Sequence, residues 1–209
     1  ALMAPAKKAK KPTVERNTPT SAVVNANQSP GMLAAVMAAD LAVEKVKASE
    51  GPIAIVGAKN TSTSSGQLAF YARRMAEQGV VGVVLANSPE FVAAAAGGDE
   101  VFGTNPIAFG IPQPEGGAPL TFDMATSAIA LFGVLTAKAQ GVPLPHGVAY
   151  AKDGAGFTTD ASEALEGGAI ATFGGHKGAG LALMVELLAG VLPGGHVLGS
   201  GKSKKKAKK

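Results

Sequence analysis

A glycine-rich turn in the last third of the chain has the composition expected of a binding site. Gly174-Gly-His-Lys-Gly-Ala-Gly180 lies between an apolar run that predicts a strand, Ala169 to Phe173, and one that predicts a buried helix, Gly178 to Leu192. Glycines let a ligand approach the backbone, and N–H groups at the start of a helix attract anions. Lys177 would add a positive charge for a phosphate or a carboxylate. A tight turn with a solvated lysine is the alternative, and both interpretations remain open.

Polar side chains elsewhere offer further candidates. The run Asn60-Thr-Ser-Thr-Ser-Ser65 follows a predicted strand, where open α/β sheets gather ligands, although turn hydroxyls more often bond the local backbone. Asp123 ends a predicted strand and either orients a ligand or caps the following helix. Histidine titrates near neutral pH, so His176 in the glycine turn is a candidate proton donor, although a lone loop histidine is more often inert. No metal site is expected, because no metal-ligand spacing involves His146, His176 or His196.

Several classes of protein are excluded or disfavoured by what the sequence lacks. Without cysteine there are no disulfides, no thiolate catalysis and no cysteine-ligated zinc, which fits a reducing cytoplasmic or organellar compartment. No phosphate-binding loop of the G-x-x-x-x-G-K-[ST] type occurs, and no G-x-G-x-x-G follows a strand. The longest apolar stretch, Gly178 to Leu192, contains Glu186 and falls short of the ~20 residues that cross a bilayer. We therefore expect no membrane partner.

The elements that must position these groups alternate between helix and strand. A helix begins after Pro30-Gly31 and stops before Gly51, and a polar turn leads into a second helix from about Gln67 to Gln78. Two apolar runs, Ile53–Val56 and Val80–Leu85, are predicted to be neighbouring buried strands. The order predicts an α/β fold, a mixed sheet with flanking helices. Later expected elements are strands at Ile107–Ile111 and Leu120–Phe122, a helix from Thr126 or Ser127 to Gly141, and a short helix after Asp160.

Charge divides the chain into a core and two basic ends. Between Thr13 and Gly201, nine basic residues stand against fifteen acidic ones, a net charge of −6, whereas the whole chain carries +4. We expect a basic disordered tail over residues 1–12, an α/β domain over 13–198 and a lysine-rich tail over 199–209. The tails could bind RNA or an acidic partner, or act only as solubilising ends. The ten lysines concerned are Lys7, Lys8, Lys10, Lys11, Lys202, Lys204, Lys205, Lys206, Lys208 and Lys209.

Four segments in this order resemble the type-2 malate/L-lactate dehydrogenase family. They are Asn27-Gln-Ser-Pro-Gly31, Phe102-Gly-Thr-Asn-Pro-Ile-Ala-Phe109, Phe122-Asp-Met-Ala-Thr-Ser127 and the glycine turn with the helix after it, Gly174 to Gly190. The resemblance implies an α/β fold of non-Rossmann type, usually dimeric, that binds NAD or NADP. It also implies hydride exchange between a small 2-hydroxyacid and its 2-keto acid. Residues that match the family's cofactor contacts are Ser88, Asp123, Met124, Ala125 and Lys177.

The sequence departs from the family pattern in two respects. Ser64 stands where the family has a histidine as general acid/base, and a serine cannot exchange a proton near neutral pH without a neighbouring base. Family members are also much longer at both ends, so the domain is expected to be truncated. If the chain is active, His176 becomes the fallback proton donor. The alternative is a catalytically degenerate core that serves as a structural or interaction subunit.

Overall fold

The computed structural model describes residues 5–48 and 52–197, which form two compact units. Each unit is assembled from separate stretches of the chain, where the sequence predicted one domain over 13–198. Unit 1 draws on Ala1–Ala86, Ile107–Met124 and Leu188–His196, and unit 2 draws on Asn87–Pro106, Ala125–Leu187 and Val197–Lys209. Both contain short strands and helices, so the prediction of a mixed α/β fold is confirmed.

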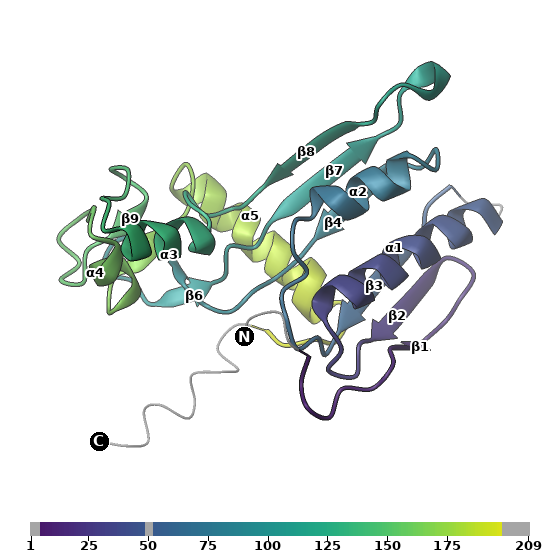
Figure 1. The fold of residues 1–209 in the computed structure, drawn as a ribbon, viewed down its shortest axis with the longest axis horizontal. Coiled ribbons are helices and arrows are strands. Elements are labelled where there is room, and N and C mark those ends of the chain that lie inside the picture. The colour runs from purple at the N-terminus through teal and green to yellow at the C-terminus, as the bar shows by residue number, and fades with distance from the viewer. Residues whose placement is uncertain (1–4, 49–51, 198–209) are drawn as a thin grey trace. The chain divides into compact units, whose positions relative to one another are not determined.

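Unit 1 begins with a three-stranded sheet of order β1-β2-β3. Strand β2 (Ser21–Asn25) pairs antiparallel with β1 (Thr13–Glu15) and parallel with β3 (Ile55–Lys59). The parallel pair requires a crossover, which helix α1 (Gly31–Ala48) supplies as the sequence predicted. Figure 1 shows α1 lying along this sheet. The alternating burial of β2, with Ala22 and Val24 buried, shows that one face of the sheet is covered.

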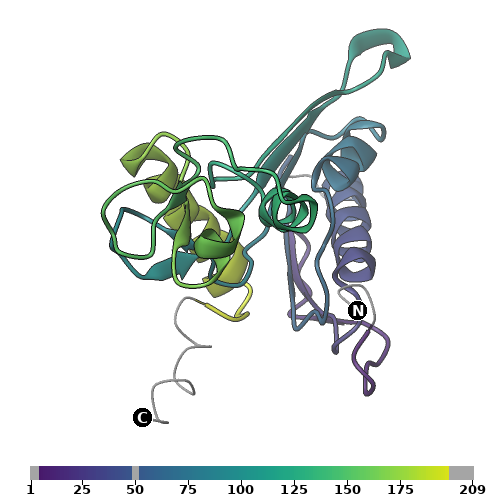
Figure 2. The ribbon, with the colours of Figure 1, turned by 60° about the vertical axis from the view of Figure 1, so that its left-hand side comes forward.

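The second sheet of unit 1 is an antiparallel meander of order β4-β7-β8. It consists of β4 (Gly82–Leu85), β7 (Ile107–Ile111) and β8 (Leu120–Met124), with a short 3-10 turn at Pro114–Gly116 joining the last two. Helix α2 (Ala69–Ala76) packs on one face, beside α1 (Figure 2). Leu68, Tyr71, Ala72, Met75 and Ala108 form the core between α2 and the sheet, together with Ala39 and Val43 of α1.

The prediction that Ile53–Val56 and Val80–Leu85 are neighbouring buried strands is wrong. Strand β3 pairs with β2, whereas β4 pairs with β7, so the two runs belong to different sheets. Each lies at the edge of its sheet, and Ile53 and Ile55 are 69% and 58% exposed. An apolar run identifies a strand, but it does not identify the distant segment that pairs with it.

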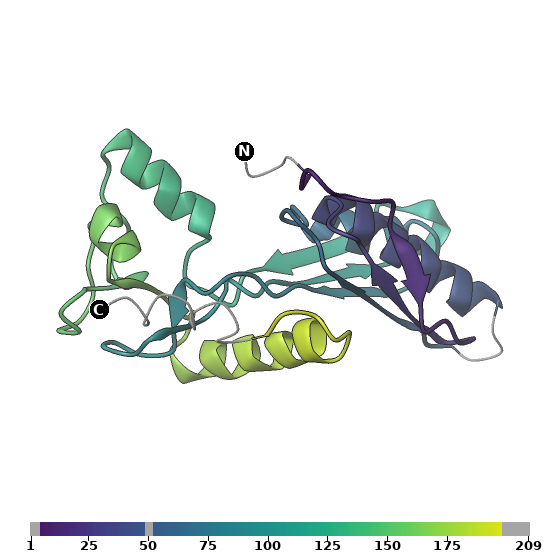
Figure 3. The same cartoon turned by 90° about the horizontal axis from the view of Figure 1, so that it is seen from below.

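Unit 2 contains a four-stranded sheet of order β6-β5-β10-β9. The strands are β5 (Val92–Ala93), β6 (Glu100–Phe102), β9 (Ala149–Tyr150) and β10 (Ala169–Ala171), and only β5 and β10 run parallel. Val92, Val134, Leu144, Ile170 and Ala182 are among the core residues. The helices of the unit are α3 (Leu131–Gln140), α4 (Ala161–Leu165) and α5 (His176–Glu186). A π-helical turn, η2 (Leu187–Val191), follows α5 in the chain, and its residues from Leu188 onward belong to unit 1 (Figure 3).

A capping contact explains where α4 begins, and buried hydroxyls explain why α3 begins later than predicted. The Asp160 side chain accepts hydrogen bonds from the Ser162 and Glu163 amides at the start of α4, at 2.7 and 3.4 Å. Helix α3 begins at Leu131 rather than at Thr126 or Ser127, which corrects the prediction. Both of those residues are buried, and their hydroxyls bond backbone carbonyls instead of opening a helix.

The basic N-terminal segment differs from the disordered tail that the sequence predicted. Within the described part, the Lys10 amide donates to Asn27 O at 3.0 Å, and the Ser29 hydroxyl donates to Lys10 O at 2.7 Å. These bonds attach the segment to the loop between β2 and α1. Residues 1–4 and the lysine-rich tail over 199–209 lie outside the described residues. None of the described helices has the length and apolar character needed to cross a membrane.

Candidate functional site

The glycine turn of unit 2 connects β10 to α5 tightly. Gly174 and Gly175 have φ values of 55° and 61°, a region that side chains disfavour, and helix α5 starts at the next residue. A Cβ on Gly178 would lie 2.0 Å from the Phe173 carbonyl oxygen, so only glycine permits this approach. His176 and Lys177 are exposed on the first turn of the helix. The arrangement places a cation beside the backbone N–H groups of a helix start, which suits an anion.

Ser88 lies directly against Gly103, Thr104 and Asn105 of the Phe102-Gly-Thr-Asn-Pro segment. The Thr104 amide donates to Ser88 Oγ at 3.0 Å, and the two hydroxyl oxygens are 3.4 Å apart. A Cβ on Gly103 would lie 2.1 Å from Ser88 Oγ, so glycine is needed for the backbone to come this close. The motif therefore holds the Ser88 hydroxyl in a defined place.

Behind Ser88 lies a buried polar group, Asn105, which is fully inaccessible to solvent. Its Oδ1 accepts from the Ser88 amide at 3.3 Å, and its Nδ2 donates to the Ala182 carbonyl and to Glu186 Oε2 at 3.1 and 3.0 Å. The other carboxylate oxygen of Glu186 accepts from Asn87 Nδ2 at 3.0 Å. We call Asn87, Ser88, Thr104, Asn105, Thr126 and Glu186 the Asn105 network.

Thr126 links this network to the glycine turn. Its hydroxyl lies within hydrogen-bonding distance of the carbonyl oxygens of Thr104 and Asn105, at 3.1 and 3.0 Å, and its amide donates to Thr104 O at 2.9 Å. The Thr126 carbonyl accepts from the Phe173 amide at 3.1 Å, directly before the glycine turn. Hydrogen bonds thus connect Ser88 to the turn that carries Lys177, within unit 2.

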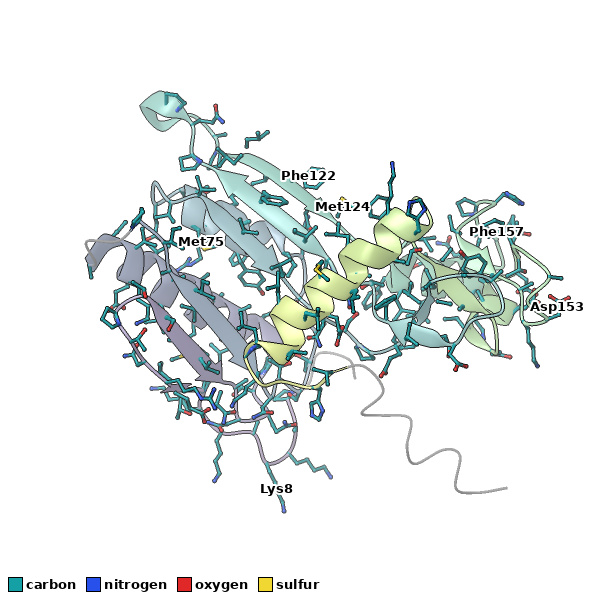
Figure 4. The ribbon with its side chains drawn as sticks, turned by 180° about the vertical axis from the view of Figure 1, so that it is seen from behind. Lys8, Met75, Phe122, Met124, Asp153 and Phe157 are labelled. Atoms are coloured by element: carbon teal, nitrogen blue, oxygen red, sulfur yellow. The ribbon has the colours of Figure 1, made fainter. Side chains whose placement is uncertain are left out.

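In the Asp123-Met-Ala125 segment, the Asp123 carboxylate caps a helix, but not the helix that the sequence predicted. Asp123 Oδ2 accepts from the Ala69 amide at 2.8 Å, at the beginning of α2. It therefore caps an earlier helix, which corrects the expectation that it caps the helix after it. Met124 lies on the opposite face of β8 from Asp123, and Ala125 is the first residue of the next stretch of unit 2. Figure 4 labels Met124 on this strand.

Ser64 takes part in a turn. Its Oγ accepts from the Gly66 amide at 3.0 Å, and the neighbouring Thr63 hydroxyl accepts from the Gly31 amide at 3.0 Å. The Tyr71 hydroxyl donates to the Ser65 carbonyl, and burial raises the pKa of Tyr71. These bonds satisfy local backbone groups, which is the turn interpretation of the polar run. No histidine or carboxylate is among the hydrogen-bond partners described for Ser64.

The candidate residues divide between the two units. Unit 2 brings together Ser88 and the glycine turn with His176 and Lys177, and it also contains Ala125. Unit 1 contains Ser64, Asp123 and Met124. Among the residues that the structure describes, no group of three potential metal ligands occurs.

Three residues of the Asn105 network were not predicted as site residues from the sequence: Asn105, Thr126 and Glu186. One signal was present, because Glu186 is the only charged residue in the apolar stretch from Gly178 to Leu192. A carboxylate is costly to bury unless it is hydrogen-bonded, so partners had to exist elsewhere in the chain. The distant segments that supply them, at Asn87 and Asn105, were not identifiable from that helix alone.

The chain is similar to known oxidoreductases along most of its length. It is 52% identical over 120 residues to the delta(1)-pyrroline-2-carboxylate reductase of Pseudomonas fluorescens, covering 57% of this chain and 35% of that protein. It is 38% identical over 182 residues to the L-sulfolactate dehydrogenase of Methanothermobacter thermautotrophicus, covering 87% of this chain and 51% of that protein. The chain spans about half, or less, of the length of the curated relatives it matches.

Solved structures and a family model agree with these relatives. The delta1-piperideine-2-carboxylate reductase of Pseudomonas syringae matches with a TM-score of 0.79 and 38% identity, over 89% of this chain and 55% of that one. The malate dehydrogenase of Entamoeba histolytica matches with a TM-score of 0.82 and 29% identity, over 90% and 54%. The family model for malate/L-lactate dehydrogenase matches residues 4–209. The chain therefore belongs to the malate/L-lactate dehydrogenase family of oxidoreductases.

Proposed function

We propose that the chain is the coenzyme-binding part of an oxidoreductase that uses NAD or NADP. The observation that carries the proposal is the chain of hydrogen bonds in unit 2 from Ser88 through Thr104 and Thr126 to the glycine turn. It holds a hydroxyl and a cationic helix start in one compact unit. Both groups also match the family's coenzyme contacts by position.

The chemistry of these groups fits a nicotinamide coenzyme. The start of α5, with Lys177, suits the phosphate groups, and an ideal Cβ on Gly174 or Gly175 would meet no atom within 4 Å, so the backbone there is open to a ligand. The Ser88 hydroxyl adds a polar contact. When bound, the coenzyme supplies or accepts the hydride.

Two substrate classes share the feature that this site would need, a double bond next to a carboxylate. The relatives include dehydrogenases named for sulfolactate and malate and reductases named for pyrroline- and piperideine-2-carboxylate. Reduction of a keto acid requires a proton on the developing alkoxide, and Ser64 has no described partner that could supply one. A protonated cyclic imine already carries its proton on nitrogen, so hydride addition to carbon needs no such donor. We therefore infer that a cyclic imine is the better substrate.

The test is turnover by the 209-residue chain, with NADH and with NADPH. Δ1-pyrroline-2-carboxylate should be reduced faster than pyruvate or oxaloacetate by about 10²-fold or more, the range that general acid catalysis contributes. Faster turnover of a keto acid would contradict the substrate assignment and make His176 the first candidate proton donor. The absence of both turnover and coenzyme binding would favour the alternative of a catalytically degenerate core, whereas coenzyme binding without turnover would show that the coenzyme-binding part needs the rest of the oxidoreductase.

Coenzyme binding is testable separately, by replacing the cation at the helix start. Lys177→Ala removes a charge-assisted contact worth about 1.5–3 kcal/mol. The affinity for NADH or NADPH, measured by fluorescence titration, should therefore fall roughly tenfold or more relative to the unmodified chain. Lys152→Ala, which removes another exposed lysine of unit 2, is the control and should leave the affinity unchanged. Equal affinity in the two variants would mean that Lys177 is only a turn residue.

We also propose that the chain forms a homodimer, as the family resemblance implies. Support comes from the face of the β4-β7-β8 sheet opposite α2, which Figure 4 presents with Phe122 labelled. Val83, Leu120 and Phe122 on this face are 51%, 59% and 52% exposed. Large exposed apolar patches mark interaction surfaces. Light scattering should give about twice the 20.7 kDa of the chain, and Phe122→Glu should return that mass to the monomer value.

A second candidate function is weak binding of RNA or an acidic partner through the lysine-rich ends. Lys7, Lys8, Lys10 and Lys11 are exposed, and Figure 4 shows Lys8 pointing away from the fold. Each phosphate neutralised on a single strand should add about 0.7 to the slope of affinity against salt in a log–log plot. A filter-binding salt titration, with deletion of residues 1–12 and 202–209 as the comparison, measures this. Identical curves would reduce the tails to solubilising ends.

A further inference from the structure

We propose that Glu186 is a positioning residue for the coenzyme site: its buried carboxylate sets the orientation of the Asn105 amide, which in turn holds the Ser88 loop. The proposal rests on the proposed function for the role of Ser88 in coenzyme binding. It adds a residue that lies at the end of α5, ten residues beyond the start of the helix at His176. Glu186 does not need to touch the coenzyme itself.

The Glu186 carboxylate is buried without a cationic partner among the described residues. Glu186 is 3% exposed, and no lysine, arginine or histidine is among its described partners. Side-chain amides satisfy it instead, Asn87 at one oxygen and Asn105 at the other. A carboxyl group in this environment is costly to keep for packing alone, because an apolar side chain of similar volume would avoid the desolvation cost. This favours a role that a leucine or methionine could not perform.

The hydrogen bonds of the Glu186 carboxylate also fix the direction of the Asn105 amide. A carboxylate only accepts hydrogen bonds, so the nitrogen of the Asn105 amide must face it and the oxygen must face away. That oxygen is the atom that accepts from the Ser88 amide at 3.3 Å. The second N–H of Asn105 Nδ2 donates to the Ala182 carbonyl at 3.1 Å, so the amide has no free donor. Rotating it by 180° would point N–H groups at the Ser88 amide, which is also a donor.

The backbone of Asn105 itself has an unusual conformation. Its φ is 37°, in the left-handed region, and the next residue is Pro106. A residue before proline is pushed towards extended conformations, so this geometry is strained and must be held by its surroundings. The three side-chain hydrogen bonds of Asn105 hold it, and one of them depends on Glu186. The shape of the Thr104-Asn-Pro106 backbone, which contacts Ser88, thus depends on a carboxylate 81 positions further along the chain.

The decisive variant is Glu186→Gln, which keeps the shape but offers one acceptor and one donor. Only one of the two asparagine amides can then keep its present orientation. Amide exchange by ¹H–¹⁵N NMR on the 209-residue chain reads the result without any coenzyme. We expect the Ser88 amide and both Nδ2 protons of Asn105 to exchange slowly in the unmodified chain, and the Ser88 amide to exchange at least tenfold faster in E186Q.

Coenzyme binding is the second readout, and Glu163→Gln is its matched control. The Glu163 carboxylate also belongs to unit 2 and accepts two hydrogen bonds, from the Lys152 amide and the Thr158 hydroxyl. It has no described bond to the Asn105 network. Fluorescence titration with NADH and NADPH should give about fivefold to tenfold weaker binding in E186Q, the size of one lost hydrogen bond, and no change in E163Q.

The outcomes separate this proposal from the function on which it rests. If Ser88 exchange and coenzyme affinity in E186Q stay within twofold of E163Q, Glu186 only fills the core and the proposal is overturned. If the unmodified chain binds neither coenzyme but Ser88 exchange still accelerates in E186Q, the positioning role stands and the proposed function fails. Should E186Q not fold, the unmodified chain still decides, because fast exchange of the Asn105 Nδ2 protons would contradict the network.

Discussion

Ser88 and Ser64 are both hydroxyl residues at positions that the family resemblance singles out, yet their surroundings differ. Ser88 is held by Thr104 and Asn105, whose own partners are buried and come from distant parts of the chain. Ser64 bonds an amide two residues away in an exposed turn. The comparison indicates that the position of the Ser88 hydroxyl is fixed by the core of unit 2, whereas nothing in the described surroundings of Ser64 prepares it for proton transfer.

The largest expected effect follows from removing the centre of the buried network. Asn105→Ala leaves the Ser88 amide, the Ala182 carbonyl and one oxygen of Glu186 without their present partner. Unsatisfied buried groups cost about 1–3 kcal/mol each, so the free energy of unfolding should fall by about 3 kcal/mol. Urea denaturation followed by circular dichroism measures it, with Gln67→Ala, an exposed amide, as control. A loss below about 1 kcal/mol would show that the surroundings of Ser88 are no more firmly held than the exposed turn of Ser64.

A smaller effect is expected from Asp123, which supports α2 next to the Ser64 loop. Asp123→Ala removes the acceptor for the Ala69 amide and a negative charge at a helix start. Capping and dipole contributions together predict a loss of about 1.5 kcal/mol in the free energy of unfolding. Asp123→Asn retains an acceptor and should recover about half. If both variants lose the same amount, the charge matters more than the hydrogen bond.

Tyr71 tests how firmly the Ser64 loop is held. Tyr71→Phe removes the hydroxyl that donates to Ser65 O and should cost about 1 kcal/mol at neutral pH. Because burial raises the pKa of Tyr71, its contribution is complete below the unfolded pKa near 10 and disappears as pH rises through the folded value. The stability difference between native and variant chains should therefore shrink in alkaline solution. Tyr150→Phe is the control, and a pH-independent difference would contradict this.

The smallest expected effect belongs to Ser64 itself. Ser64→Ala removes one local hydrogen bond in an exposed turn, so the free energy of unfolding should change by less than about 0.5 kcal/mol. The rate of imine reduction should stay within twofold. A large loss of rate would show that Ser64 does act on the substrate, and the two serines would then be partners in one reaction.

The sequence predicted the helices better than the sheets, for physical reasons. Helix α1 and helix α4 have local signals, a Pro-Gly start and an aspartate cap. Strands β5 and β9 are only two residues long, and their pairing depends on segments far away in the chain. Periodicity in so short a run carries no information about its partner. The same limit applied to the site. Lys177 could be predicted because its signal, the glycine turn, lies in its own segment of the chain.

The partners of Glu186 needed contacts that no local pattern encodes. Its isolated charge in an apolar helix indicated that polar partners existed, without saying where. Asn105 stood inside a segment that resembles the family, but its role follows only from the geometry around Ser88. Asp123 was thus a candidate from the sequence and Glu186 was not, and each has a partner that the sequence did not identify.

The division of each unit into separate stretches has a consequence for synthesis of the chain. Unit 1 contains early residues but lacks Leu188–His196 until all of the unit 2 stretches up to Leu187 have been synthesised, and Pro193 from that late stretch packs against Gly57 of β3. Unit 2 is likewise interrupted by the β7–β8 hairpin. Neither unit can be completed on the ribosome before the other is nearly finished. The chain therefore cannot fold one unit at a time from the N-terminus. A break anywhere between residues 87 and 187 would leave both units incomplete.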